Sequence, residues 1–294
     1  MKQKLAPLWV LLAGVLWGTT GTAQTYAPEA AHPIAVGAAR LAVGGISLLI
    51  IVLLLGQLNL RKWPIKVTFA AALCMAAYQP LFFTAVQLTG VAVGTVIAIG
   101  SAPLLSGALE WLVQKKSPSR GWWYATFLSI FGCILLFSNS DSMNVAPSGI
   151  VMALGAGLSF AVYTLVSRRL VQNYPSLPVV AVVFTLSAVF LSPFLFLYDM
   201  SWIAEPEGLA VSLHLGIMAT GVAYLLFAKA LYYVPSSTAV TLALAEPLTA
   251  AFLGVLLVGE QLDLVSWAGV SCLLAGIGFL MFLRAKKEAE VSVS

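Results

Sequence analysis

The sequence is dominated by ten apolar runs, each about as long as a helix that crosses a lipid bilayer. A hydrocarbon core of about 30 Å requires about 20 helical residues. Polar, charged or proline-containing segments separate the runs, which cover residues 6–27, 34–56, 67–87, 91–114, 122–139, 148–168, 177–198, 207–231, 236–258 and 264–283. We therefore predict an all-α integral membrane protein with ten transmembrane helices joined by short loops.

The composition of the 294 residues excludes the soluble classes of protein. Hydrophobic residues make up 61% of the chain and charged residues 9%, whereas soluble domains contain about half and about a quarter, respectively. A water-soluble fold could not bury this much apolar surface, so soluble enzymes and nucleic-acid-binding proteins are excluded. The partner that the composition predicts is the lipid bilayer.

The N-terminal run and the cysteines have simpler interpretations than processing or redox chemistry. Lys2 and Lys4 before an apolar run imitate a signal peptide, but the run exceeds the usual hydrophobic region of about 7–15 residues. We therefore keep it as the first span. Cys74, Cys133 and Cys272 lie in separate apolar runs without CxxC spacing, so we expect them to pack as small hydrophobic side chains.

The basic residues give the chain a predicted orientation. If ten helices alternate in direction, thirteen of the 15 lysines and arginines fall at one end of the bundle: Lys2, Lys4, Arg61, Lys62, Lys66, Lys115, Lys116, Arg120, Arg168, Arg169, Arg284, Lys286 and Lys287. The loops at the other end contain acidic residues and no Lys or Arg: Glu29, Asp141, Asp199, Glu205, Glu207, Glu260 and Asp263. Because cytoplasmic loops are enriched in Lys and Arg, we predict that both termini are cytoplasmic. Another number of helices would scramble this pattern.

The second half of the chain repeats the first. An offset of 144 residues aligns the third to fifth apolar runs with the last three, and it pairs Pro103 with Pro247, Trp123 with Trp267 and Gly132 with Gly276. Each half holds five helices, and because five is odd the second copy enters the membrane from the opposite face. Inverted repeats are typical of secondary transporters, which bind substrate near the midplane between the halves. We divide the chain into a first five-helix repeat (1–146), an inverted second repeat (147–284) and a cytoplasmic tail (285–294).

Several short motifs resemble the EamA-type transporters of the drug/metabolite transporter superfamily. They are Trp17-Gly18 in the first run, Glu246-Pro247 in the ninth, Gly259-Glu260 at its end, and Trp267-x-Gly269 followed by Gly276 in the last. The resemblance covers essentially the whole chain, which looks most similar to the YddG-type amino-acid exporters of this family. It implies a ten-helix carrier of the inner (cytoplasmic) cell membrane that exports amino acids or related metabolites.

Glu246 is the main candidate for a functional residue because it lies near the middle of the ninth apolar run. A charge there costs about 2.5–3.5 kcal/mol on the insertion scale, so the carboxyl group must face a wet cavity, pair with a cation or stay protonated. It then contacts a substrate amine or carries a proton. The alternative is a structural carboxyl that accepts hydrogen bonds where Pro247 interrupts the helix. Pro103 and Pro247 are both predicted to open their helices at mid-depth, while the repeat equivalent of Glu246 is Ala102.

Other polar and aromatic side chains near the middle of their runs complete the predicted substrate-binding site: Trp17, Tyr78, Gln79, Phe82, Ser101, Tyr163 and Tyr224. Phe82 lies one helical turn from Tyr78 and Gln79, on the same face. These side chains and Glu246 come from the first, third, fourth, sixth, eighth and ninth helices, which we expect to line a central cavity. For each aromatic residue, packing in the protein core is the alternative.

Four further titratable residues lie within the apolar runs or near their ends. Lys229 is expected to extend to the cytoplasmic interface, and Glu110 is interpreted as an interfacial charge. Arg40 either extends to the outer interface or pairs with a carboxylate such as Glu246, and the sequence leaves both open. His214 is expected at the outer interface, with a role in proton coupling as the alternative.

The prediction from all these features is a secondary transporter that works by alternating access. We expect it to export amino acids with apolar or aromatic side chains, or related small metabolites, because an aromatic cavity with few fixed charges suits a zwitterion. The sequence shows no phosphate-binding loop, metal-ligand set or catalytic triad, so we expect no cofactor, no metal and no enzymatic activity. A channel-like facilitator, a structural membrane subunit and an uptake permease for another metabolite are the alternatives. The substrate, the direction of flux, the coupling ion and the oligomeric state stay open.

Overall fold

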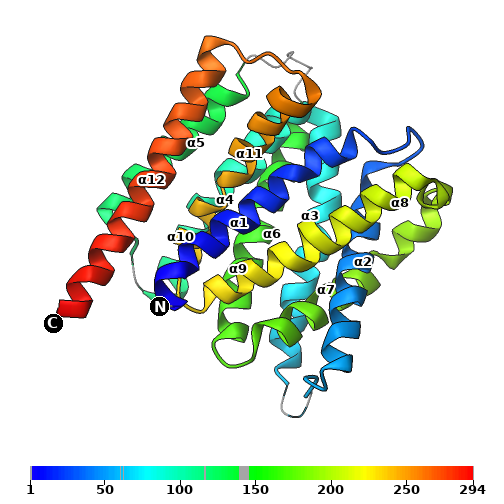
Figure 1. The fold of residues 1–294 in the computed structure, drawn as a ribbon, viewed down its shortest axis with the longest axis horizontal. Coiled ribbons are helices and arrows are strands. Elements are labelled where there is room, and N and C mark those ends of the chain that lie inside the picture. The colour runs from blue at the N-terminus through cyan, green and yellow to red at the C-terminus, as the bar shows by residue number, and fades with distance from the viewer. Residues whose placement is uncertain (1, 60, 62, 116, 139–145, 294) are drawn as a thin grey trace.

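The computed structural model describes residues 2–59, 61, 63–115, 117–138 and 146–293, and all regular secondary structure among them is helical (Figure 1). The first half of the chain forms α1 (Lys2–Gln24), α2 (Pro33–Leu54), α3 (Ile65–Thr89), α4 (Val91–Gln114) and α5 (Arg120–Leu136). The second half begins with α6 (Pro147–Val171), α7 (Ser176–Leu197) and a short 3-10 helix, η1 (Ser201–Ala204). The eighth span consists of α8 (Pro206–Leu213), η2 (His214–Val222) and α9 (Ala223–Leu231), and the ninth consists of α10 (Ser236–Leu242), α11 (Ala245–Leu253) and η3 (Gly254–Val258). The last helix is α12 (Leu264–Val293). The predicted all-α fold is confirmed.

Local sequence signals set the starts of several helices. Proline occupies the first turn of α2, α6 and α8, at Pro33, Pro147 and Pro206, where a backbone N–H has no partner within the helix. The hydroxyl of Ser119 accepts the backbone N–H of Trp122 at 3.2 Å and so caps α5. This cap starts α5 at residue 120, two residues before the predicted boundary.

The last helix is longer than the apolar run predicts. α12 continues to Val293 instead of ending near residue 283, so the predicted tail is helical over its described part. Residues 285–290 are Ala, Lys and Glu, which have high helix propensity. The helix therefore propagates beyond the apolar segment.

The two repeat-equivalent prolines lie in different backbone contexts. The ninth span is interrupted at Ala243 and Leu244, directly before the helix that contains Pro247. In a regular helix the N–H of residue 247 would bond to the Ala243 carbonyl, but Pro247 has no N–H. The N–H of Glu246 bonds to this carbonyl instead, at 2.9 Å. By contrast, α4 runs through Pro103 without a break. The predicted opening at Pro103 is therefore wrong for this conformation, because the long packing of α4 on α6 supports the helix around one lost hydrogen bond.

The eighth span contains an irregular segment in its middle. Residues His214–Val222 form the π-helix η2. The N–H of Ala223, for example, bonds to the carbonyl of Met218, five residues back rather than four. π segments are rare and are frequent at functional sites, so this part of the bundle is a candidate for a functional role.

Helices of the first half pack mainly on helices of the second half. α3 and α4 pack on α6, and the equivalent contacts of the other half are made by α1 with the eighth and ninth spans. α2 packs on α7 and α5 on α12, so in these two pairs each helix contacts its own repeat equivalent (Figure 1). This is the contact pattern of an inverted repeat about a pseudo-twofold axis in the membrane plane.

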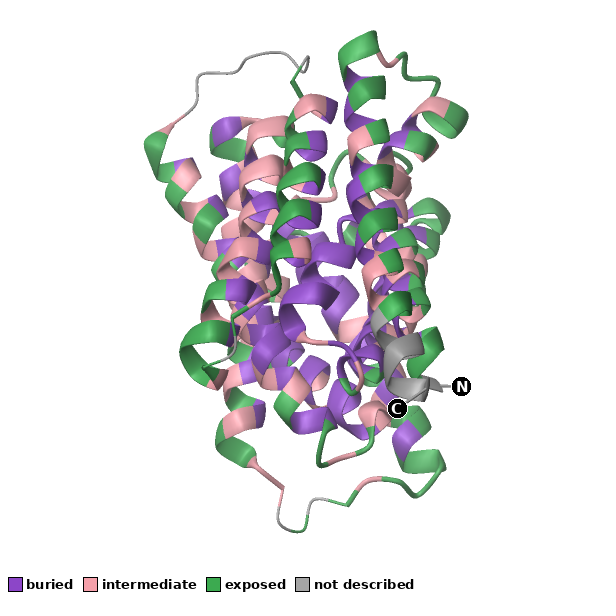
Figure 2. Ribbon diagram, turned by 90° about the vertical axis from the view of Figure 1, so that its left-hand side faces the viewer, coloured by how far each residue is buried: buried purple, intermediate pink, exposed green. Residues whose placement is uncertain are grey.

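The outer surface of the bundle is apolar. Figure 2 shows exposed residues along the outward faces of the helices and buried residues inside, and Phe196 and Leu264 are 88% and 89% exposed. Among the described residues, nine helical stretches of at least 18 residues are apolar enough to cross a membrane, and α5, with 17 residues, is a shorter tenth. This surface requires lipid rather than water around it, and the chain is a multi-pass membrane protein.

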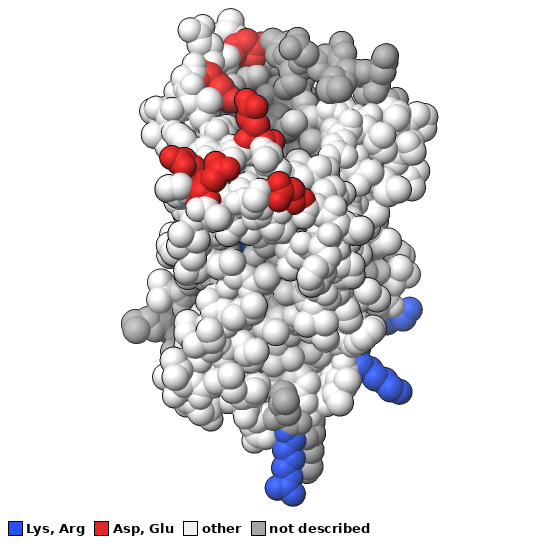
Figure 3. Space-filling view, turned by 90° about the vertical axis from the view of Figure 1, so that its right-hand side faces the viewer, with Lys and Arg blue, Asp and Glu red and all other residues white. Residues whose placement is uncertain are grey.

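Charged side chains separate to the two ends of the bundle. On the face drawn in Figure 3, acidic residues gather at one end and basic residues at the other. The start of α1 and the end of α12 both lie at the basic end (Figure 1). Lys62, Lys116 and Asp141, which belong to the predicted pattern, lie outside the described residues.

Glu110 is a buried residue, so its interpretation as an interfacial charge is wrong. Only 6% of it is exposed. One carboxylate oxygen lies 3.5 Å from Nη1 of Arg168 in α6, and the other accepts the backbone N–H of Ser237 in α10 at 3.0 Å. The packing of α4 on α6 and α10 covers the carboxylate. Glu110 thus joins three helices of both halves at the basic end.

The predicted orientation is testable with single cysteines in a variant whose native cysteines are replaced. Cysteines beside Glu29, Glu205 and Asp263 are expected to react with a membrane-impermeant thiol reagent in intact cells, because the acidic loops are predicted to lie outside. Cysteines beside Arg120 and Arg169 are expected to react only after permeabilisation. A reproducible reversal at one of these sites would contradict the ten-span topology with cytoplasmic termini.

Candidate functional site

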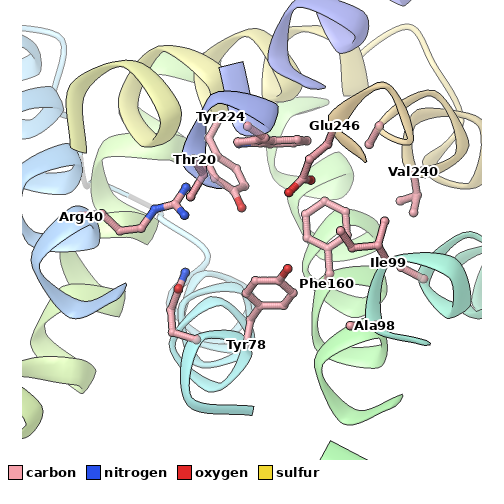
Figure 4. A pocket seen from close by; sticks show the side chains of 13 residues that line it. Thr20, Arg40, Tyr78, Ala98, Ile99, Phe160, Tyr224, Val240 and Glu246 are labelled. Atoms are coloured by element: carbon pink, nitrogen blue, oxygen red, sulfur yellow. The ribbon is translucent and has the colours of Figure 1, made fainter. Parts of the chain in front are cut away.

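A cavity lies between helices of both halves of the chain (Figure 4). Its volume is about 50 Å³, which is room for a few waters. Residues of the first, second, third, fourth, sixth, eighth and ninth spans line it: Trp17, Thr20, Arg40, Tyr78, Gln79, Ala98, Ile99, Ala102, Phe160, Tyr224, Val240, Ala243 and Glu246.

Five residues that the sequence suggested for a substrate site border this cavity: Trp17, Tyr78, Gln79, Tyr224 and Glu246. They are distant in the sequence and come from α1, α3, α9 and α11. The six spans expected to line a cavity all contribute to it, and α2 joins them through Arg40. The cross-packing of the two halves therefore brings these side chains together.

Three other candidates, Phe82, Ser101 and Tyr163, do not line the cavity. Phe82 stacks on Tyr78 with ring centroids 5.6 Å apart. The Ser101 hydroxyl donates to a carbonyl within its own helix at 3.3 Å. Tyr163 is 1% exposed and packs against the ring of Tyr224, with ring centroids 5.8 Å apart. Each lies at about the right depth in its helix, but its side chain points into neighbouring protein.

Phe160 occupies the place at the cavity that we expected for Tyr163. It lies almost one turn earlier on the same side of α6, and its ring meets that of Trp17 edge to face, with centroids 5.9 Å apart. An offset of 143 residues aligns Gly14 with Gly157 and Trp17 with Phe160. This weak repeat between the first and sixth spans is the signal that could have identified Phe160.

Arg40 follows neither of the two alternatives that the sequence left open. It is 9% exposed, so it does not extend to the outer interface. Its Nε donates to Thr220 Oγ1 at 3.1 Å and its Nη2 to the Ala219 carbonyl at 3.2 Å, both in η2. No carboxylate of the described residues forms an ion pair with it. In Figure 4 the guanidinium and the carboxylate of Glu246 point into the cavity from different sides.

The cavity lies on the pseudo-twofold axis between the repeats. Ile99 and Ala243 are equivalent at the offset of 144 residues, and both line the cavity. The same holds for Ala102 and Glu246. Equivalent positions meet at one cavity only where the axis passes close to it. The residue types nevertheless differ, so a symmetric backbone carries an asymmetric site.

Several polar groups at the cavity have no hydrogen-bond partner in the described part of the protein. Trp17 Nε1 and Thr20 Oγ1 are buried and unpartnered. The Glu246 carboxylate and the phenol groups of Tyr78 and Tyr224 border the cavity without a side-chain hydrogen bond to described residues. Buried polar groups normally find a partner, so water or a bound molecule is the partner available here.

Aromatic rings form much of the remaining wall. The ring of Trp17 lies 4.8 Å from that of Tyr224, centroid to centroid, and the ring of Tyr78 lies 6.1 Å from that of Phe160. Such rings contact apolar side chains, and their faces attract ammonium groups. The cavity thus combines one cationic side chain, one carboxyl side chain and an aromatic wall.

Comparisons with known proteins identify the family of this chain. The model of the EamA-like transporter family matches residues 4–138 and again residues 147–282. The chain is 52% identical to the uncharacterized transporter YwfM of Bacillus subtilis over 99% of both chains. It is 27% identical to the threonine/homoserine exporter RhtA of Escherichia coli K12, over 97% of this chain and 94% of that one. A crystal structure at 20% sequence identity shares the fold, with a TM-score of 0.83 over 96% of this chain and 98% of the other. The chain belongs to the EamA-like transporter family.

Proposed function

We propose that this transporter exports amino acids with apolar or aromatic side chains by alternating access, without hydrolysing ATP. The observation that carries the proposal is the cavity on the axis between the two halves, where Arg40, Glu246 and a wall of aromatic rings meet. A zwitterion with an apolar side chain complements all three features, once the cavity, which has room for only a few waters in this conformation, widens around it. Substrate sites of inverted-repeat transporters lie at this kind of position.

The inverted repeat supports the transport mechanism. Two inverted halves that pack about one axis can exchange conformations, so that a site open to one side becomes open to the other. The irregular backbone lies next to the cavity: Ala243 at the break of the ninth span lines it, and η2 holds Arg40. These segments are the places where the helices can adjust as the halves move.

The relative RhtA supports the substrate class, since it is a threonine/homoserine exporter. We propose a larger side chain for the present substrate because four aromatic rings, of Trp17, Tyr78, Phe160 and Tyr224, border the cavity. Their wide apolar faces favour an apolar or aromatic group over a small hydroxylated one.

Counterflow in proteoliposomes tests the proposed function. The purified full chain is reconstituted, loaded with one unlabelled amino acid of a panel, and assayed for saturable uptake of the same labelled L-amino acid. We expect flux for phenylalanine and leucine, competition by L- over D-isomers, and no requirement for ATP. Flux that does not saturate or discriminate isomers would indicate a channel-like facilitator. Direction is tested in cells that are fed a dipeptide as a source of internal amino acid. Internal amino-acid levels below those of cells without the protein would indicate export, and levels above them uptake.

Replacement of Glu246 tests whether its charge takes part in transport. Glu246→Gln keeps the size and most hydrogen-bonding capacity but removes the charge and the titration. We expect roughly a 10- to 100-fold higher KM, since hydrogen bonds to charged groups contribute about 1.5–3 kcal/mol, and a flatter dependence of flux on pH. Near-normal flux for Gln with damage only in Glu246→Ala would instead identify a structural carboxyl.

The unpartnered indole N–H of Trp17 gives a second test, with a matched control. Trp17→Phe removes no hydrogen bond within the described protein, so we expect the melting temperature to fall only by what the smaller ring loses in packing. KM is expected to rise about 2- to 10-fold if the N–H donates to the substrate, the range for a hydrogen bond of about 0.5–1.5 kcal/mol.

Trp202 is the control because its indole N–H is also buried and unpartnered among the described residues, but it packs in a separate cluster around η1. Trp202→Phe is expected to lower the melting temperature by leaving a void and to leave KM unchanged. Equal changes of KM in both variants would contradict a substrate contact of Trp17.

A further inference from the structure

Arg40 is the positive charge at the cavity, and the proposed function leaves its role unassigned. We propose that Arg40 binds the carboxylate of the transported amino acid, while Glu246 faces its ammonium group. The inference rests on the proposed function for the amino-acid substrate, and it assigns the residue that recognises one end of it.

The orientation of Arg40 is fixed by two hydrogen bonds. Its Nε donates to Thr220 Oγ1 at 3.1 Å and its Nη2 donates to the Ala219 carbonyl at 3.2 Å. A guanidinium has five N–H donors in one plane, so these bonds hold the plane and leave further donors. Figure 4 shows the guanidinium directed into the cavity. The remaining donors are therefore presented to whatever occupies it.

The π-helix η2 provides the acceptors for these bonds. The N–H of Ala223 bonds to the carbonyl five residues back, at Met218, and not to Ala219, whose carbonyl receives Arg40. The hydroxyl of Thr220 donates to the Leu215 carbonyl at 2.8 Å, so its lone pairs are directed at the Arg40 Nε. In a regular α-helix the carbonyl of Ala219 would instead accept the backbone N–H of Ala223, four residues later.

Close backbone contact brings α2 to η2. A Cβ atom at Gly44 would lie 2.6 Å from the Gly216 carbonyl and 2.8 Å from Thr220 Cγ2. Only glycine fits at this approach, one turn after Arg40 in α2. The short distance between the helices lets the arginine reach η2 and still face the cavity.

The charges at the cavity are complementary to a zwitterion. Arg40 forms no ion pair with a described carboxylate, and Glu246 makes no ion pair with a described cation, although both border the same cavity. Buried charges without a partner are costly. A simple anion would meet Glu246 and a simple cation would meet Arg40, so an occupant with both charges fits best. Arginine binds carboxylates through two parallel hydrogen bonds, which matches the donors left free.

Ligands that lack one of the two charges test the assignment. Purified full-length protein is titrated with L-phenylalanine, with phenethylamine, which lacks the carboxylate, and with 3-phenylpropionate, which lacks the ammonium group. Binding is read from the ligand-dependent rise of the melting temperature. L-threonine and its two analogues, 1-amino-2-propanol and 3-hydroxybutyrate, form a second series. We expect the wild type to bind the amino acid about 10- to 100-fold more tightly than the amine.

Variants then assign the discrimination to Arg40. Arg40→Gln is expected to lose the 10- to 100-fold preference for phenylalanine, with its affinity for phenethylamine changed less than about threefold. Thr220→Val removes the acceptor that orients the guanidinium, together with the hydroxyl's own bond to the Leu215 carbonyl in η2. We expect a smaller loss for phenylalanine and none for the amine. Lys229→Gln, which removes an exposed cation from α9 away from the cavity, is the control and should match the wild type.

Several outcomes would overturn the assignment. Equal affinity of the wild type for phenylalanine and phenethylamine would do so without any variant, and so would an equal loss for both ligands in Arg40→Gln. If Arg40→Gln does not fold, a Thr220→Val protein with unchanged discrimination overturns it. If the wild type binds neither amino acid, the proposed function fails. The assignment then depends on 3-phenylpropionate: binding that Arg40→Gln abolishes supports it, and absence of binding overturns it.

Discussion

The packing of one half of the chain on the other is the interaction on which the rest of the structure depends. α3 and α4 pack on α6 as α1 packs on the eighth and ninth spans, while α2 and α5 pack on their own repeat equivalents. Lipid chains are as apolar as the helices, so close packing rather than the hydrophobic effect holds transmembrane helices together. Because this packing runs between the halves, neither half forms the cavity alone.

The pseudo-symmetry of the backbone contrasts with the asymmetry of the side chains. Ala102 and Glu246 occupy equivalent positions at the cavity, as do Trp17 and Phe160. The alternating access that we propose requires the two halves to exchange conformations, and a shared backbone geometry suits that exchange. The different side chains make the sides of the cavity chemically unlike, with a carboxyl group from the second half and an arginine from the first. A substrate with two unlike ends needs such a site.

Irregular backbone is concentrated where the charged side chains are. Arg40 is held by the π-helix η2, and Glu246 lies in the first turn of α11, directly after the break at Ala243 and Leu244. At membrane depth, broken helices are tolerated only inside protein or beside a water-filled cavity. The backbone irregularities and the charges thus require the same environment.

The sequence by itself determined the all-α fold and the apolar spans, because the bilayer thickness dictates the length of each span. It also determined the inverted repeat, because Pro, Trp and Gly residues match at one offset. It also located Trp17 and Glu246 at the right depth. Only tertiary packing decided which face of each helix is directed at the cavity. Phe160 rather than Tyr163 lines it, and Arg40 is directed inward. The physical reason is that a helix apolar on all sides has no amphipathic face to reveal its orientation, so contacts with the other half select which side chains meet.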